Sequence, residues 1–235
     1  PYQLDFPRTS VEDIAAAARA ACHAIGIDHV HTGAGNSLGG MDALAYAIMY
    51  PGEYRDLISI SAATRATPFA IALRSLQREM IRTDPAWAGG YYEPGTEPFE
   101  GMRLARKLGL MSYRSAEEYL QRFDRERVGD PDIPGRDPFE TEFTVESYLD
   151  NNARKFIETF DANSYLYITR AMDYFDLAQE YGGKLARAWT DTPTRFCVIS
   201  FTSDWLYPTA ESRAIVHALN AAAAKVSFVE IETDK

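Results

Sequence analysis

A short glycine-rich segment carries the residues best suited to covalent chemistry. Residues 31–41 read HTGAGNSLGGM and place Ser37 between Gly35 and Gly39, after a segment with strand character and before one with helical character. In such a G-x-S-x-G turn the glycines let two backbones approach, and the strain lifts the serine hydroxyl above the sheet. The next amide, that of Leu38, falls at a helix N-terminus, which favours an oxyanion. The pattern predicts a nucleophilic Ser37, against the alternative of a glycine-rich turn that holds a phosphate or nothing.

A nucleophilic serine needs an acid and a base, which in a strand-turn-helix site follow it in the order Asp or Glu, then His. Asp204 fits the acid because it stands just after the apolar segment 195–201, in the turn Thr-Ser-Asp-Trp. A carboxylate at the carboxyl end of a parallel strand can face the same crevice as Ser37. On the pattern alone, Asp204 fits a simple Asx turn equally well.

The base is harder to find among the four histidines. None of them follows 225–232, the last segment with strand character. His29 and His31 share one face of a strand and are interpreted as core or near-core histidines, whereas His217 is interpreted as a surface residue of a helix. His23 lies on the first helix. We therefore expect the catalytic histidine to lie beyond the last residue, so that the chain lacks its tail.

Two stretches of mixed helix and strand character flank a long helical block. The first stretch contains a helix at 10–25, a strand at 28–35, a helix at 41–50 and a strand at 57–61. The second contains a strand at 195–201, a loop at 202–208, a helix at 209–224 and a strand at 225–232. This alternation predicts a parallel sheet with crossover helices.

The block between them has helical periodicity and no strand signal. Its predicted helices are 67–81, 99–110, 115–126, 144–160 and 164–182, with a loop rich in Pro, Gly and Asp at 129–143. We predict that 1–64 and 191–235 are parts of one α/β core and that 65–190 is a helical insertion. The aromatic residues Tyr165, Tyr167, Tyr174 and Phe175 are interpreted as core of this insertion or as a dimer seam.

The composition argues against several classes of protein. A formal net charge of −10 and a pI near 4.9 oppose nucleic-acid binding, which needs clustered Lys and Arg. No apolar run approaches the roughly 18 residues of a membrane span, and the N-terminus does not resemble a signal peptide. Cys22 and Cys197 lie far apart in apolar segments without metal-ligand spacing, which favours buried free thiols. We expect a soluble cytoplasmic protein without a metal ion, a nucleic-acid partner or a membrane partner.

Four blocks in order resemble one family. They are GNSLGGM at 35–41, LARKLGLMSYRS at 104–115, KFIETFDANSYLYITRAMDYFD at 155–176 and SFTSDWLYP at 200–208. Over nearly its whole length the chain resembles the homoserine O-acetyltransferases and their serine and succinyl-CoA relatives. The resemblance implies an α/β-hydrolase fold, a mostly parallel sheet with flanking helices and an inserted helical lid.

The resemblance also assigns the site residues. It implies that Ser37 is the nucleophile and Asp204 the acid, with the base in a Gly-His-Asp segment after the final strand. The loop with the second oxyanion donor would precede residue 1, so truncation at both ends is expected. Arg106 resembles the arginine that pairs with the carboxylate of the amino-acid substrate, and Tyr113 the tyrosine beside it. Without the resemblance, Arg106 would be taken for an ordinary solvated helix arginine.

Arg103 and Lys107, on the same helix, are still interpreted as ordinary solvated residues. Asn36, Leu38 and Asp42 depart from the residues that many members of the family carry at these positions. Because these departures lie at the turn and in the helix that follows it, they could alter the preference for donor or acceptor.

The activity implied is ping-pong transfer of an acetyl or succinyl group from acyl-CoA to the hydroxyl of L-homoserine or L-serine. Such a reaction belongs to methionine or cysteine synthesis; acyl-CoA is a substrate, and no bound cofactor is expected. The resemblance further implies a homodimer formed through the lid helices. Two alternatives remain open: an esterase of the same fold, which passes the acyl group to water, and a catalytically dead binding protein.

Overall fold

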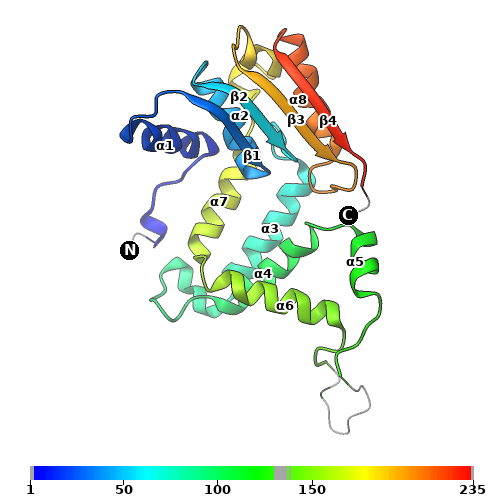
Figure 1. The fold of residues 1–235 in the computed structure, drawn as a ribbon. Coiled ribbons are helices and arrows are strands. Elements are labelled where there is room, and N and C mark those ends of the chain that lie inside the picture. The colour runs from blue at the N-terminus through cyan, green and yellow to red at the C-terminus, as the bar shows by residue number, and fades with distance from the viewer. Residues whose placement is uncertain (1–2, 130–136, 138, 234–235) are drawn as a thin grey trace. The chain divides into compact units, whose positions relative to one another are not determined.

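The computed structural model describes residues 3–129, 137 and 139–233 (Figure 1). Part of the predicted loop 129–143 therefore lies outside the described residues. Contacts within the chain divide it into two compact units. We call residues 8–71 and 167–233 the sheet unit, and the described residues of 1–7 and 72–166 the helical unit. The limits of an inserted lid at 65 and 190 stay a prediction.

The sheet unit is built on four strands. They are β1 (Val30–Asn36), β2 (Tyr54–Ile60), β3 (Arg195–Phe201) and β4 (Lys225–Ile231). All three neighbouring pairs are parallel, and the spatial order is β1-β2-β3-β4 (Figure 1). The parallel sheet with crossover connections is confirmed, and β3 has the predicted limits.

Three helices of the sheet unit pack against the strands or against one another. They are α1 (Val11–Ala24), α2 (Leu38–Met49) and α8 (Thr209–Ala221), with short 3₁₀ turns at η3 (Gln179–Tyr181) and η4 (Leu185–Trp189). A capping box between Ser10 and Asp13 begins α1. Side chains of alternate strand positions meet these helices in one core, which includes Leu44, Leu57, Trp189, Val198 and Leu219. Cys22 and Cys197 are free, as predicted, but only half-buried.

The helical unit consists of helices and short 3₁₀ turns. Its helices are α4 (Phe99–Met111), α5 (Ala116–Phe123) and α6 (Thr144–Ile157), with turns at η1 (Gln3–Asp5) and η2 (Pro85–Gly90). Two further helices, α3 (Pro68–Thr83) and α7 (Ala162–Tyr174), begin in one unit and end in the other. The unit has its own core, which includes Ile81, Met102, Ala105 and Leu166.

The predicted helix at 164–182 is too long, because α7 ends at Tyr174. The backbone beyond this point bonds to another segment instead of continuing the helix. The Ala66 amide donates to the Phe175 carbonyl at 3.0 Å, and the Leu177 amide donates to the Thr64 carbonyl at 2.9 Å. Helical periodicity in the sequence does not reveal such a long-range pairing.

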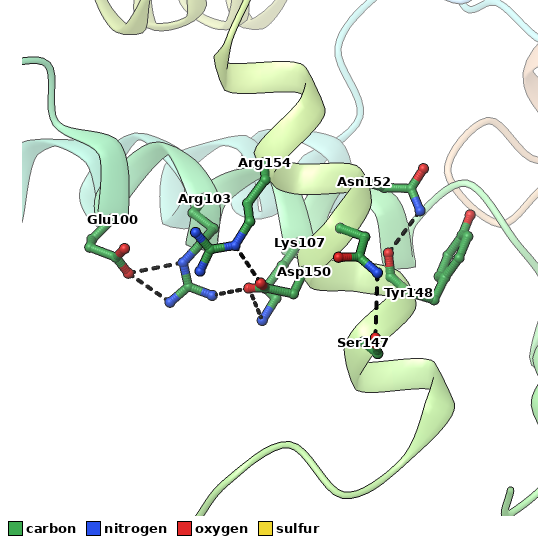
Figure 2. A network of polar contacts seen from close by, with 9 residues as sticks. Glu100, Arg103, Lys107, Ser147, Tyr148, Asp150, Asn152 and Arg154 are labelled. Carbon is green, nitrogen blue, oxygen red and sulfur yellow. Dashed lines mark hydrogen bonds and ion pairs between the residues drawn. The ribbon is translucent and has the colours of Figure 1, made fainter. Parts of the chain in front are cut away.

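One carboxylate joins α4 to α6 in the helical unit (Figure 2). Asp150 of α6 accepts from Arg103 Nη1 at 2.5 Å, lies 3.1 Å from Lys107 Nζ, and accepts from Arg154 Nε at 2.6 Å. The hydrogen bond from Arg154, with those from the two α4 cations, holds the pKa of Asp150 well below its usual range. Arg103 is also bonded to Glu100. The expectation that Arg103 and Lys107 are ordinary solvated residues is therefore wrong.

Replacing Asp150 with asparagine is expected to lower the free energy of unfolding at pH 7 by about 1–3 kcal/mol, because three cations lose their shared anion. A lowered carboxyl pKa stabilises the fold fully above the unfolded pKa of about 4, and this stabilisation is lost as the pH falls from there through the lower folded pKa. The difference between the two proteins should therefore begin to shrink below about pH 4 and should decrease further at each lower pH. Urea unfolding at pH 7, pH 4 and pH 2 measures it. Glu100→Gln is the control, since this exposed side chain has one partner and should cost less than about 1 kcal/mol.

Candidate active site

The junction of β1 and α2 is a strained turn. Asn36 ends the strand, Leu38 begins the helix, and Ser37 alone connects them with φ 51° and ψ −120°. Positive φ is unfavourable for a residue with a side chain, so the surroundings must impose it. The Ser37 amide donates to the Ile60 carbonyl of β2 at 3.0 Å, which ties the turn to the sheet.

Close backbone approach makes this turn possible. A Cβ on Gly35 would lie 2.1 Å from the carbonyl oxygen of Gly39. A Cβ on Gly40 would lie 2.7 Å from the Cβ of Ala62, whereas a Cβ on Gly39 would meet nothing within 4 Å. Gly35 and Gly40 are therefore the glycines that the packing of the turn requires.

The turn presents one hydroxyl and one amide. Ser37 is half-buried, and its hydroxyl makes no capping hydrogen bond to α2. Among the residues that the structure describes, neither the Ser37 hydroxyl nor the Leu38 amide has a hydrogen-bond partner. An unpartnered hydroxyl beside an unpartnered amide at a helix N-terminus has the composition of a nucleophile with one oxyanion donor.

Backbone amides hold one oxygen of the Asp204 carboxylate. Its Oδ1 atom accepts from the amides of Leu206 at 3.0 Å and Tyr207 at 2.8 Å. This is the Asx-type turn that the pattern allowed. Within the described part of the chain, Oδ2 accepts no hydrogen bond. The turn therefore fixes the carboxylate and leaves one oxygen available to orient another group.

Ser37 and Asp204 leave the same edge of the sheet. Ser37 follows β1 and Asp204 follows β3, with β2 between them. Neighbouring strands lie about 4.8 Å apart, so β1 and β3 are separated by about 10 Å. Thr233, just past β4, exchanges hydrogen bonds of 3.0 Å with the Thr202 hydroxyl. The chain beyond β4 therefore runs beside the turn that carries Asp204.

The histidines lie elsewhere. His29 and His31 are exposed, which contradicts their interpretation as core or near-core histidines; β1 is an edge strand of the sheet that the described residues form, so fewer neighbours cover them there. His31 stands near the opposite end of β1 from Ser37, about 20 Å along the strand. His23 approaches Glu53, which precedes β2, and His217 is exposed on α8, as predicted. The identity of the base stays a prediction.

The two predicted substrate-binding residues meet in the helical unit. Arg106 Nη1 donates to the Tyr113 hydroxyl at 3.3 Å, and the guanidinium carbon lies 5.3 Å from the centre of the Tyr113 ring. Among the described residues Arg106 has no ion pair, and its buried Nε has no acceptor. The pair therefore offers a cation with N–H groups that remain available to bind an anion.

Phe156 also contacts Arg106, although no local motif in the sequence points to it. The ring of Phe156 in α6 lies 4.2 Å from the guanidinium carbon of Arg106. Phe156 falls inside the block 155–176 that resembles the family, and this position was the one signal available. Tyr165, interpreted only as core or dimer seam, packs edge-on against Phe156.

A profile described as alpha/beta hydrolase fold matches residues 4–229. The chain belongs to the α/β-hydrolase fold family. The predicted fold class is thereby confirmed, and the strained turn of this α/β-hydrolase chain has the strand-turn-helix context of the G-x-S-x-G motif.

The similarity to individual proteins is more specific than the similarity to the fold family. Serine O-succinyltransferase of Litchfieldella anticariensis is 59% identical over 98% of this chain and 63% of that protein. Homoserine O-acetyltransferase of Rhodopseudomonas palustris strain BisB18 is 46% identical over 100% of this chain and 58% of that protein. A crystal structure of homoserine O-acetyltransferase from Bacillus anthracis matches with a TM-score of 0.86 and 25% identity, over 99% of this chain and 61% of that chain. The resemblance to these acyltransferases is confirmed, and the α/β-hydrolase chain spans about three fifths of their length.

A shallow hollow of about 360 Å³ lies away from the turn. It is lined by Thr32, Asp56, Arg195 and Ser227, among others, on the strands of the α/β-hydrolase sheet. In the strand register, Thr32 and Asp56 stand four residues before Asn36 and Ile60, about 13 Å from the edge that carries Ser37. The hollow is therefore separate from the candidate site.

The described residues contain neither a cluster of metal ligands nor a helix that could span a membrane. Among residues 3–129, 137 and 139–233, no three His, Cys, Asp or Glu side chains gather as metal ligands would. Over the same residues, no helix of the α/β-hydrolase chain has the length and apolar character to cross a membrane.

Asp42 is a half-buried carboxylate on α2, the helix that follows the turn. Its Oδ1 atom is inaccessible to solvent and has no hydrogen-bond partner among the described residues. Burial raises the pKa of Asp42, because desolvation disfavours the charged form. A raised carboxyl pKa means that the folded state binds this proton more tightly than the unfolded state. Stability from this group is therefore lost as the pH rises above about 4.

Replacing Asp42 with asparagine is expected to raise the free energy of unfolding at pH 7 by about 1 kcal/mol, because a buried charge is removed. The gain should shrink toward pH 4, where the wild-type carboxyl becomes neutral. Urea unfolding between pH 4 and 8 measures the difference. Asp28→Asn is the control, since that carboxylate is 75% exposed. A gain independent of pH would contradict the assignment to the Asp42 charge.

Proposed function

We propose that the protein containing this chain is an O-acyltransferase. It moves an acetyl or succinyl group from acyl-CoA to the side-chain hydroxyl of L-serine or L-homoserine, in cysteine or methionine synthesis. The observation that carries the proposal is Ser37, which is held at positive φ; among the described residues, neither its hydroxyl nor the adjacent amide of Leu38 has a hydrogen-bond partner. The names of the relatives support the classes of donor and acceptor.

In the first half-reaction the Ser37 oxygen attacks the thioester carbonyl, and its proton passes to a histidine. The Leu38 amide donates to the oxyanion that forms. The carbon–sulfur bond then breaks, the CoA sulfur receives the proton, and an ester remains on Ser37. Oδ2 of Asp204, which accepts no hydrogen bond from the described residues, orients the histidine and stabilises its charged form. By the family resemblance, this histidine follows β4, where Thr233 runs beside the Asp204 turn.

In the second half-reaction the acceptor amino acid binds through its carboxylate to Arg106 and Tyr113. Its side-chain hydroxyl gives a proton to the histidine and attacks the ester, and the proton returns to Ser37 as the O-acyl amino acid leaves. A guanidinium suits the carboxylate because it can donate two parallel hydrogen bonds. Holding the acceptor hydroxyl close to the ester favours transfer over hydrolysis.

We further propose a cytoplasmic homodimer that takes small-molecule substrates and binds no cofactor. The support for these points is the family resemblance. Sedimentation of the purified full-length protein would test the dimer, since a monomer at micromolar concentration contradicts it.

A donor-by-acceptor grid tests the function. Full-length protein is mixed with acetyl-CoA or succinyl-CoA and with L-serine, L-homoserine or no acceptor, and free CoA, free acid and O-acyl amino acid are measured. A burst of CoA without acceptor, followed by O-acyl product when acceptor is added, supports acyl transfer. Free acid that does not fall as acceptor rises supports the esterase alternative. No CoA release with either donor supports the binding protein.

A further inference from the structure

The three cations on α4 do not have equal roles. Arg103 and Lys107 share the carboxylate of Asp150, as Figure 2 shows. Arg106 stands between them in sequence but has no ion pair among the described residues, and its Nε has no acceptor. Partly burying a guanidinium without an anion costs free energy, unless another interaction compensates for the lost hydration.

Aromatic rings supply that compensation. The Arg106 guanidinium carbon lies 4.2 Å from the centre of the Phe156 ring and 5.3 Å from that of Tyr113. Both distances are within the range of cation–π attraction. Because Tyr113 is on the same chain segment as Arg106 and Phe156 is on α6, the Phe156 ring is the contact that fixes the guanidinium against a different helix.

Phe156 is itself held in place. Its ring stacks on Phe160 at 4.9 Å with an interplanar angle of 19°. The Tyr165 ring packs edge-on against both, at 6.2 Å from Phe156 and 6.3 Å from Phe160. A ring fixed by two neighbours is a rigid platform, so it restricts the orientations of the cation that lies on it.

We propose that Phe156 is a positioning residue for the acceptor carboxylate, acting through Arg106. This inference rests on the proposed function. A guanidinium binds a carboxylate with two hydrogen bonds only in one relative orientation, and a free arginine must lose rotamer freedom to reach it. The Phe156 platform removes part of that loss before the acceptor arrives. It thereby sets the preference for amino acids over amino alcohols that lack the carboxylate.

The test compares Phe156→Leu, Phe156→Tyr and Phe99→Leu in the full-length protein. Phe156→Leu removes the platform, Phe156→Tyr keeps an aromatic face, and Phe99→Leu removes a different cation–π contact, that with Arg154 at 5.7 Å. For Phe156→Leu, we expect KM for the amino acid to rise about tenfold. CoA release in the absence of acceptor should not change. Phe156→Tyr and Phe99→Leu should stay within about twofold of wild type.

A carboxylate-free acceptor separates positioning from general damage. With L-homoserine and 3-aminopropan-1-ol as acceptors, Phe156→Leu should reduce kcat/KM for the amino acid alone. An equal loss for both acceptors, an unchanged KM for L-homoserine, or an equal effect of Phe99→Leu would overturn the inference.

A binding measurement distinguishes this inference from the proposed function. If wild-type protein releases no CoA, the proposed function fails, and calorimetric titration with L-homoserine and L-serine still reports on the carboxylate site. About tenfold weaker binding to Phe156→Leu than to wild type and Phe156→Tyr then supports the platform. Equal binding to all three, or no binding to any, overturns it.

Discussion

Replacing Ser37 with alanine is expected to abolish the acyl-enzyme and to lower acyl transfer by about 10,000-fold or more, because no other group on the turn can form the ester. The fold should be retained, since the Ser37 hydroxyl has no partner among the described residues. Mass spectrometry of the peptide containing residue 37, after incubation with acetyl-CoA or succinyl-CoA, measures the acyl group directly.

Ser61 offers a matched control for this experiment. It follows β2 at the same edge of the sheet and has φ 45°, close to the φ of Ser37. Ser61→Ala therefore makes the same chemical change in a similar backbone conformation. We expect it to retain transfer within about threefold of wild type. An acyl group that remains on the Ser37→Ala protein, or equal losses in the two variants, would remove Ser37 from the mechanism.

Replacing Gly35 with alanine is expected to cost more than about 3 kcal/mol of unfolding free energy, or to prevent folding. The new Cβ would lie 2.1 Å from the Gly39 carbonyl oxygen and 2.7 Å from the Gly40 nitrogen, which are backbone atoms that cannot rotate away. Urea unfolding followed by circular dichroism measures the loss. Any folded fraction should also lose acyl transfer, because the turn must move.

The second glycine of the motif gives the opposite prediction. A Cβ on Gly39 would meet nothing within 4 Å, and Gly39 lies in the first turn of α2. Since alanine is a better helix former than glycine, Gly39→Ala should stabilise the fold by up to about 1 kcal/mol. Similar destabilisation by the two substitutions would show that the close approach of β1 and α2 is not what limits position 35.

The elements of the sheet could be predicted because each carries its signal locally. The segment 195–201 is apolar and rich in β-branched or aromatic residues, and β3 has those limits. The sequence pattern predicts the start of α2 too late, at 41, whereas the helix begins at Leu38. Glycines at 39 and 40 argue against helix by propensity, and tertiary packing of Gly40 on Ala62 overrides that preference.

Residues of the candidate site could be predicted from the sequence only where they directly follow a predicted strand. Ser37 and Asp204 follow strands directly, so their edge of the sheet is set by topology. The Arg103–Asp150 contact joins positions 47 residues apart, and the Arg106–Phe156 contact joins positions 50 residues apart. No local pattern reports such pairs. The exposure of His29 and His31 depends on which strand forms the edge, and this too is a property of the assembled sheet.

The backbone bonds at the carboxyl edge of the sheet have a consequence for turnover. The amides of Ser37, Ser61 and Thr202 each donate to a carbonyl of the next strand along. The proposed nucleophile is thus part of the hydrogen-bonded lattice of the sheet, and the unfavourable φ at Ser37 is imposed once, when the chain folds. In the proposed reaction, each cycle then begins with the Ser37 backbone already in the conformation that presents the hydroxyl. We expect hydrogen exchange at the Ser37 amide to be as slow as in β2, with or without acyl-CoA.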